Sequence, residues 1–235
     1  MRDNVIFNDL DYYYRSIKNE KNIFINHIEK YLGEIDNVFQ EKITEDYYLN
    51  IYHIPPTKNG FYHKLVTYGV SDTKLEKDKD FHNSKYVELI ICLPPSWYRG
   101  ENHMKDIRFG WPYKWLIEIS KQLILESSYP WYGFNINKRR TYPVANNTKQ
   151  CGFVPLQPTL ANPAFSKCNI GEDKYINFFN IVPLYEEEMK FRINRGIKAF
   201  EKKFYGNGIT ELIDVNRKNV CGNQLLNFFT NKTMI

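Results

Sequence analysis

Residues 86–97 read YVELIICLPPSW, and this segment says most about the architecture of the chain. Its first eight residues are apolar on both faces except at Glu88, as expected for a central strand covered on each side. Pro94 and Pro95 then end the strand, because proline cannot donate to a sheet ladder. Glu88 must find a partner or lie near an edge, since burying an unpaired carboxylate is very costly.

Two further strands are predicted before this central one. The segment YYLNIYHI, residues 47–54, alternates and is rich in aromatic and branched residues. Pro55, Pro56 and the pair Asn59-Gly60 interrupt the pattern before FYHKLVTYGV resumes at residues 61–70. This order indicates two strands joined by a turn-forming loop.

Three helices are predicted from apolar residues at helical spacing. The first spans residues 22–32 and stops at Gly33, and the second opens at Trp111-Pro112 and runs to about Glu126. The third spans about 185–204, with acids in its first turn and lysines near its end that complement the helix dipole. A strand through Val182 precedes it, and shorter strand-like pieces fall at 132–136 and 152–156.

Length and composition favour one globular domain over residues 1–235. With 43% hydrophobic and 25% charged residues, the 235-residue chain can bury a substantial core. We expect residues 206–235, which follow the last predicted helix, to form a peripheral appendage. Aromatic residues reach 16%, and although most should lie in the core, Tyr and Trp also suit interfaces.

Charge and targeting signals point to the cytoplasm and argue against nucleic acid as the partner. The net charge of +5 is mild and spread along the chain, whereas nucleic-acid binders concentrate basic residues on one face. The chain shows no secretory signal at its start and no apolar run of spanning length, so we expect no membrane association. The four cysteines lie far apart without a C-x-x-C pair, which favours reduced structural thiols.

Motifs for catalysis, metal binding and cofactor binding are missing from the sequence. It has no nucleophile elbow, no histidine pair at ligand spacing and no glycine-rich phosphate loop. We therefore expect no enzyme activity, no metal and no cofactor, although a triad of residues remote in sequence stays open. The alternative is a hydrolase or nuclease that uses acids near Asp72 and Glu88.

Six segments, taken in order, carry a family resemblance. The chain resembles the suppressor-of-fused domain family, stand-alone bacterial type, over about residues 24–205. Val70 stands where methionine is common in that family, and residues 127–171 match poorly apart from GFVPLQP. The matching segments are IYHIPPT (51–57), LVTYGVSD (65–72), YVELIICLPPSW (86–97), WPYKWL (111–116), GFVPLQP (152–158) and INFFNIVPLYEEEMKF (176–191).

The resemblance implies an α+β fold, with a mixed, largely antiparallel sheet flanked by helices, and no known catalytic activity. Its animal relative is a two-domain protein that sequesters a transcription factor, and that partner is not carried over. Stand-alone bacterial members resemble immunity proteins. We therefore expect a protein-binding domain that binds and neutralises a toxin domain.

We choose the residues expected to contact a partner protein because they are of types common in interfaces and lie in predicted loops. Trp, Tyr and Arg are the usual hot-spot residues. One group, Trp97, Tyr98 and Arg99, follows the central strand. The second group consists of Trp131, Tyr132, Arg139 and Arg140. The alternative for both tryptophans is that they simply cap the core.

Overall fold

The computed structural model contains a mixed sheet between helices, which confirms the predicted fold class. It describes the backbone of residues 3–58, 60–75, 84–97, 106, 108–126, 142–171 and 173–222, with side chains from residue 18 onward. Seven strands in these ranges form one sheet in the order β1-β2-β3-β4-β7-β5, with β6 also paired to β7. The strands are β1 (Asn37–Lys42), β2 (Tyr48–Ile54), β3 (His63–Tyr68), β4 (Tyr86–Leu93), β5 (Gly152–Leu156), β6 (Lys167–Asn169) and β7 (Tyr175–Leu184). All pairings are antiparallel except that of β4 with β7.

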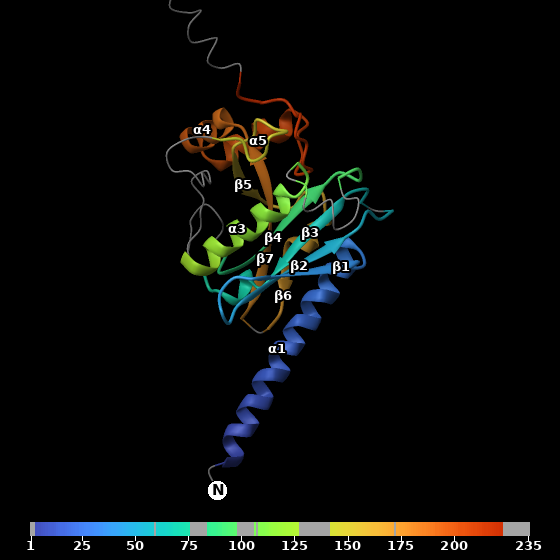
Figure 1. The fold of residues 1–235 in the computed structure, drawn as a ribbon, viewed down its shortest axis with the longest axis vertical. Helices are drawn as coiled ribbons and strands as arrows, with labels where there is room; N and C mark the ends of the chain where they lie inside the picture. Colours follow the sequence, from blue (N-terminus) through green and yellow to red (C-terminus); the bar gives the residue numbers. More distant parts are fainter. Residues whose placement is uncertain are drawn as a thin grey trace, which may run out of the picture.

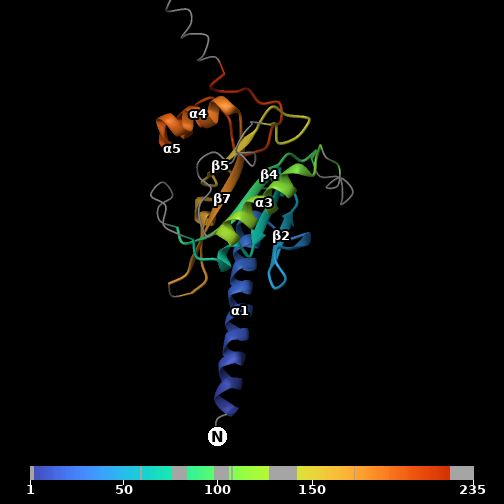
Figure 2. The ribbon, with the colours of Figure 1, turned by 60° about the vertical axis from the view of Figure 1, so that its left-hand side comes forward.

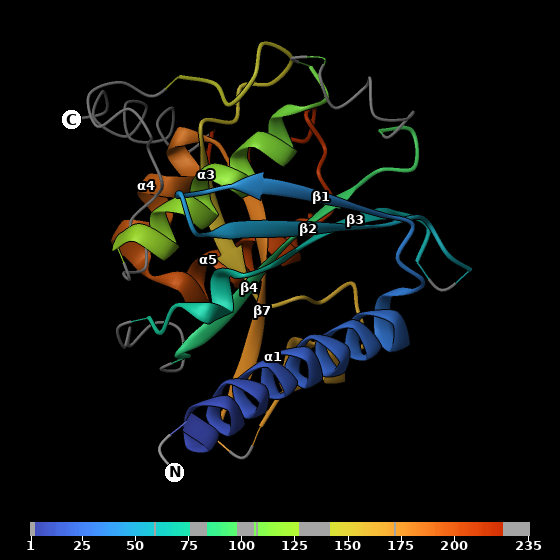
Figure 3. The same cartoon turned by 60° about the horizontal axis from the view of Figure 1, so that its bottom comes forward.

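Helices cover both faces of this sheet (Figures 1 and 3). Helix α1 (Asp3–Leu32) lies across one face, where Phe24 and Ile28 are fully buried against strand residues. Helix α3 (Trp111–Glu126) covers the opposite face through Leu116 and Leu123. Helices α4 (Glu186–Arg195) and α5 (Ile197–Gly206) lie beside β5 and the end of β7 (Figure 2).

The two central strands separate partway along the sheet, and the segment after α5 fills the space between them. Strand β4 pairs with β7 only from Tyr86 to Ile90, after which β7 continues alongside β5. Leu212 then forms a parallel bridge to Cys92, and the Ile213 backbone N–H donates to the Cys92 carbonyl at 2.9 Å. The prediction that residues after 206 form a peripheral appendage is therefore wrong for this segment.

The helices and strands differ from the sequence prediction in three places. Helix α1 begins at Asp3, well before the predicted start at residue 22, and its first turns extend beyond the sheet (Figure 1), whereas Phe24 and Ile28 nearer its C-terminal end are buried. The edge strand β1 was not predicted, since its residues are only half-buried or exposed. The predicted third helix is two helices, divided at Gly196, whose φ of +79° breaks the helical path. The predicted strand at 132–136 lies outside the described residues.

Two further expectations concern the oxidation state of the cysteines and membrane-spanning helices. All four cysteines are buried free thiols, as predicted, and burial raises the pKa of Cys151 and of Cys168 to about 11. Within the described part of the chain, no helix combines the length and apolarity needed to cross a membrane.

A buried ion pair ties the C-terminal segment to α4. The Arg217 guanidinium donates to both carboxylate oxygens of Glu188, at 2.7 and 2.6 Å, and also to the Pro183 carbonyl at 2.8 Å. The Glu188 side chain has no exposed surface and also accepts the backbone N–H groups of Tyr185 and Val220. Bidentate geometry with every oxygen satisfied is the arrangement in which a buried pair is worth most.

We predict that Arg217→Met lowers the free energy of unfolding by roughly 3–5 kcal/mol, because it leaves the buried Glu188 carboxylate without its counter-ion. The measurement is urea denaturation at neutral pH. Lys190→Met is the matched control, since Lys190 pairs with Glu186 at the exposed surface of α4 and such pairs contribute about 0–1 kcal/mol. Equal losses for the two variants would contradict the structural role of Arg217.

Candidate functional site

The Glu88 carboxylate, one of the two acids proposed for catalysis, has no exposed surface. One oxygen accepts the backbone N–H groups of Gly69 (2.9 Å) and Ser71 (3.0 Å) and the Ser71 hydroxyl (2.7 Å). The other lies 2.5 Å from the Thr67 hydroxyl. Burial raises the pKa of Glu88 to about 7, against the opposing effect of these hydrogen bonds. Glu88 is therefore a structural carboxylate that cannot touch a substrate in this conformation.

The second proposed acid, Asp72, lies on the short helix η1 (Val70–Asp72) and is exposed. The Tyr47 hydroxyl donates to the Gly69 carbonyl and lies 3.4 Å from an Asp72 carboxylate oxygen. No contact joins the carboxyl groups of Asp72 and Glu88 among the described residues. The two acids therefore do not form the paired site that the hydrolase hypothesis needs.

A histidine pair forms between β2 and β3, where sequence spacing did not reveal it. His53 Nε2 lies 3.0 Å from His63 Nδ1, while His53 Nδ1 lies 3.2 Å from an Asp36 carboxylate oxygen. The chain of contacts ends at the Pro95 carbonyl, 3.3 Å from His63 Nε2. Burial lowers the pKa of both histidines, which favours neutral rings. The described residues hold no group of three or more ligands suited to a metal ion.

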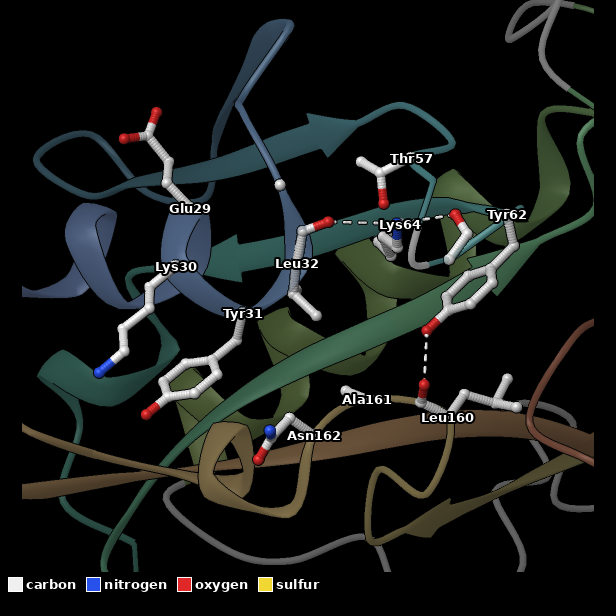
Figure 4. A pocket seen from close by; sticks show the side chains of 12 residues that line it. Glu29, Lys30, Tyr31, Leu32, Thr57, Tyr62, Lys64, Leu160, Ala161 and Asn162 are labelled. Atoms are coloured by element: carbon white, nitrogen blue, oxygen red, sulfur yellow. Dashed lines mark hydrogen bonds between the residues drawn. The ribbon is translucent and has the colours of Figure 1, made fainter.

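An open pocket of about 390 Å³ lies between the end of α1, the β2–β3 connection and the loop at 160–162 (Figure 4). Its size falls within the range of about 300–1,000 Å³ that is usual for ligand sites. Phe61, which lies between the lining residues Gly60 and Tyr62, is 75% exposed. Its lining contributes ammonium, amide and phenol groups, which can form hydrogen bonds with a ligand.

Lys64 of β3 supplies the buried charge of this pocket and is only 2% exposed. Its ammonium donates to the carbonyls of Leu32 (3.2 Å) and Gly60 (3.4 Å), and it lies 4.6 Å from the centre of the Tyr62 ring. Desolvation lowers the pKa of Lys64. Strand alternation could have identified this lysine, because a charge within HKLVTY must point to one covered face.

The end of α1 packs tightly on the β2–β3 connection, which holds the pocket in shape. Gly33 has φ of +115° and its N–H donates to the Glu29 carbonyl at 3.2 Å, closing the helix. A Cβ at Gly33 would lie 2.5 Å from a methyl carbon of Thr57. Thr57 and Gly60 exchange two backbone hydrogen bonds that shape the turn.

Of the sequence-predicted contact residues, the structure describes Trp97, which does not line this pocket. Trp97 lies in the core at 6% exposure, where it donates its indole N–H to the Phe109 carbonyl at 2.8 Å and packs edge-on against Trp111. The expectation that Trp97 anchors a partner directly is corrected by this burial, which fits the core-capping alternative. The other six residues, Tyr98, Arg99, Trp131, Tyr132, Arg139 and Arg140, lie outside the described part of the chain.

Comparison with known proteins identifies one family. The model of the suppressor of fused protein (SUFU) family matches residues 45–218. An uncharacterised protein of Ureaplasma parvum serovar 3 is 25% identical over 210 residues, which cover 87% of this chain and 97% of that protein.

Two solved structures share the fold. The crystal structure of a putative SUFU homolog from Neisseria gonorrhoeae has a TM-score of 0.61 at 16% identity, covering 87% of this chain and 97% of that chain. A chain of the Sufu–Fu complex has a TM-score of 0.55 at 14% identity, covering 91% of this chain and 96% of that chain.

The pH dependence of stability tests the structural role of Glu88. Its folded-state pKa of about 7 exceeds the unfolded value of about 4.3, so between these values the folded protein holds a proton that the unfolded chain has lost. Raising the pH through this window therefore destabilises the wild type. Glu88→Gln imitates the protonated carboxyl, so we predict that the variant gains roughly 2 kcal/mol relative to wild type between about pH 5 and pH 8.

Urea denaturation across that pH range measures the difference, with Glu118→Gln on the exposed side of α3 as the control. The control should follow the wild-type curve. A Glu88→Gln curve parallel to the wild type would show that the carboxyl titrates outside this window.

Proposed function

Because this chain belongs to the suppressor of fused family, we propose that it works by binding another protein and that it catalyses no reaction. The Sufu–Fu complex is a case in which a protein with this fold is held in a complex with another. The proposal extends that mode of action to this chain.

The main support is the way in which its ionisable groups are used. Three groups that could perform acid–base chemistry, Glu88, His53 and His63, are buried and hydrogen-bonded within the fold. A catalytic acid or base must reach the proton that it transfers. By contrast, the open pocket beside α1 presents an ammonium, amide and phenol groups, which are suited to hydrogen bonding with a ligand.

The hydrolase or nuclease alternative receives no support from this geometry. It would require Glu88 to act together with Asp72, yet one carboxyl is enclosed and the other is exposed on η1. Glu88→Gln should therefore alter stability without abolishing any turnover.

More specifically, we propose that the protein is a bacterial immunity protein that binds and neutralises a toxin domain in the cytoplasm. The Ureaplasma protein is covered over 97% of its length, which leaves no room in it for a large second domain and supports a stand-alone role. The four free, buried thiols suit a reducing compartment. A binder of this kind needs surface complementarity and no reactive group.

Co-purification with the toxin domain encoded beside the gene tests this function, together with an assay of toxin activity. We expect a stable complex and loss of toxin activity at a one-to-one ratio. A toxin domain that stays active and unbound in excess protein would refute the immunity role, and binding of a different protein would leave only the general binding function.

The predicted contact arginines give a second test of the same proposal. We predict that the double variant Arg139→Ala/Arg140→Ala weakens partner affinity at least tenfold, because buried interface arginines commonly contribute about 2 kcal/mol or more. Titration calorimetry measures the affinity, and the unfolding midpoint should not change. Arg195→Ala, an exposed arginine at the end of α4, is the control; an equal loss there would indicate a general charge effect.

A further inference from the structure

The Lys64 ammonium is a buried charge that lacks a counter-ion among the described residues. Its contacts are the two carbonyls of Leu32 and Gly60 and the face of the Tyr62 ring. No described carboxylate lies within ion-pair distance of its nitrogen. A buried cation is normally paired, since the cost of desolvating an unpaired charge is high.

Hydrogen-bond counting leaves one ammonium proton for an outside group. An ammonium has three N–H donors, and two are directed to the Leu32 and Gly60 carbonyls. Figure 4 shows the Lys64 nitrogen with a hydrogen bond on either side, one of them to the Leu32 carbonyl, among the residues that line the pocket. The third proton can therefore serve a ligand without breaking either bond.

Other groups at the pocket are donors or are already engaged. Asn162 uses its side-chain oxygen to accept the Ala164 N–H at 2.9 Å, which leaves its amide nitrogen as a donor. The Tyr62 hydroxyl donates to the Leu160 carbonyl at 3.1 Å. Glu29, the only acid of the lining, points away from Lys64 in Figure 4 and is exposed. The inner pocket thus offers donors and positive charge.

We propose that this pocket binds a carboxylate group, with the Lys64 ammonium as its counter-ion. A volume of about 390 Å³ corresponds to roughly a dozen water molecules, more than a carboxylate alone occupies. The space fits a carboxylate together with the chain that carries it. The partner protein as carrier, through an acidic side chain or its C-terminus, rests on the proposed binding function; the carboxylate site itself does not.

Amide NMR spectra of the purified protein test the site without any partner. The probes are sodium acetate, the blocked peptide acetyl-Gly-Asp-Gly-amide and the peptide acetyl-Gly-Gly with a free C-terminus. Acetyl-Gly-Asn-Gly-amide serves as the uncharged control. We expect saturable shifts at the amides of Gly33, Gly60 and Tyr62 with one or both acidic peptides at lower concentration than with acetate. Wild-type spectra unchanged by all three acidic probes would overturn the proposal.

Two variants identify the groups responsible. Lys64→Met keeps the aliphatic stem but removes the charge, and should weaken probe binding at least tenfold, while Lys64→Arg should restore part of it. Asn162→Asp keeps the oxygen that accepts the Ala164 N–H and adds a negative charge to the lining, so it should also weaken binding of the anionic probes about two- to threefold. Because Asn162 is exposed, this variant tests the site even if Lys64→Met fails to fold.

The controls carry the same substitutions elsewhere. Lys121→Met lies on α3, across the sheet, and Asn50→Asp keeps the oxygen that accepts from Gln40. Both should bind the probes like wild type, and unchanged binding in Lys64→Met and Asn162→Asp would overturn the site. If those two variants bind the probes more weakly but retain the partner protein, the carboxylate belongs to a small acid and not to the partner.

Discussion

Glu88 carries a carboxylate into the centre of the sheet, and the backbone around it is arranged to receive that group. Its hydrogen bonds come from the end of β3 and from η1, so they hold the β3–η1 connection against β4. Gly69 turns the chain there with φ of +133°, which places its N–H on the carboxylate. The hydrogen bonds that hold this connection also enclose the Glu88 carboxylate. It therefore has no contact with solvent and cannot act on a substrate.

The separation of β4 from β7 is the second constraint, because it opens an unpaired strand edge inside the molecule. Unpaired backbone groups in a buried position are costly, and Ile213 satisfies one of them by donating to Cys92. The ion pair between Arg217 and Glu188 then fixes this segment to α4.

A strand or helix could be predicted from the sequence where its apolar residues keep one pattern along its whole length. Strands β2 and β3 and helix α3 were predicted from the spacing of their apolar residues, and β4 from a run that is apolar on both faces. Strand β1 was missed because an edge strand leaves alternate residues exposed and has little apolar character. The break at Gly196 was missed because the apolar spacing continues through it, from Met189 to Phe200 in one cluster.

Local order was therefore determined by the sequence alone: the central strand, its proline stop, the helix on each side and the family. Only the tertiary structure decided which side chains meet. It buried Trp97, joined His53 to His63 across two strands, and placed the Lys64 ammonium between carbonyls that lie 32 and 4 residues away. Periodicity reports which face a residue occupies, whereas contacts between distant segments depend on strand register and on how the chain closes, which no local pattern encodes.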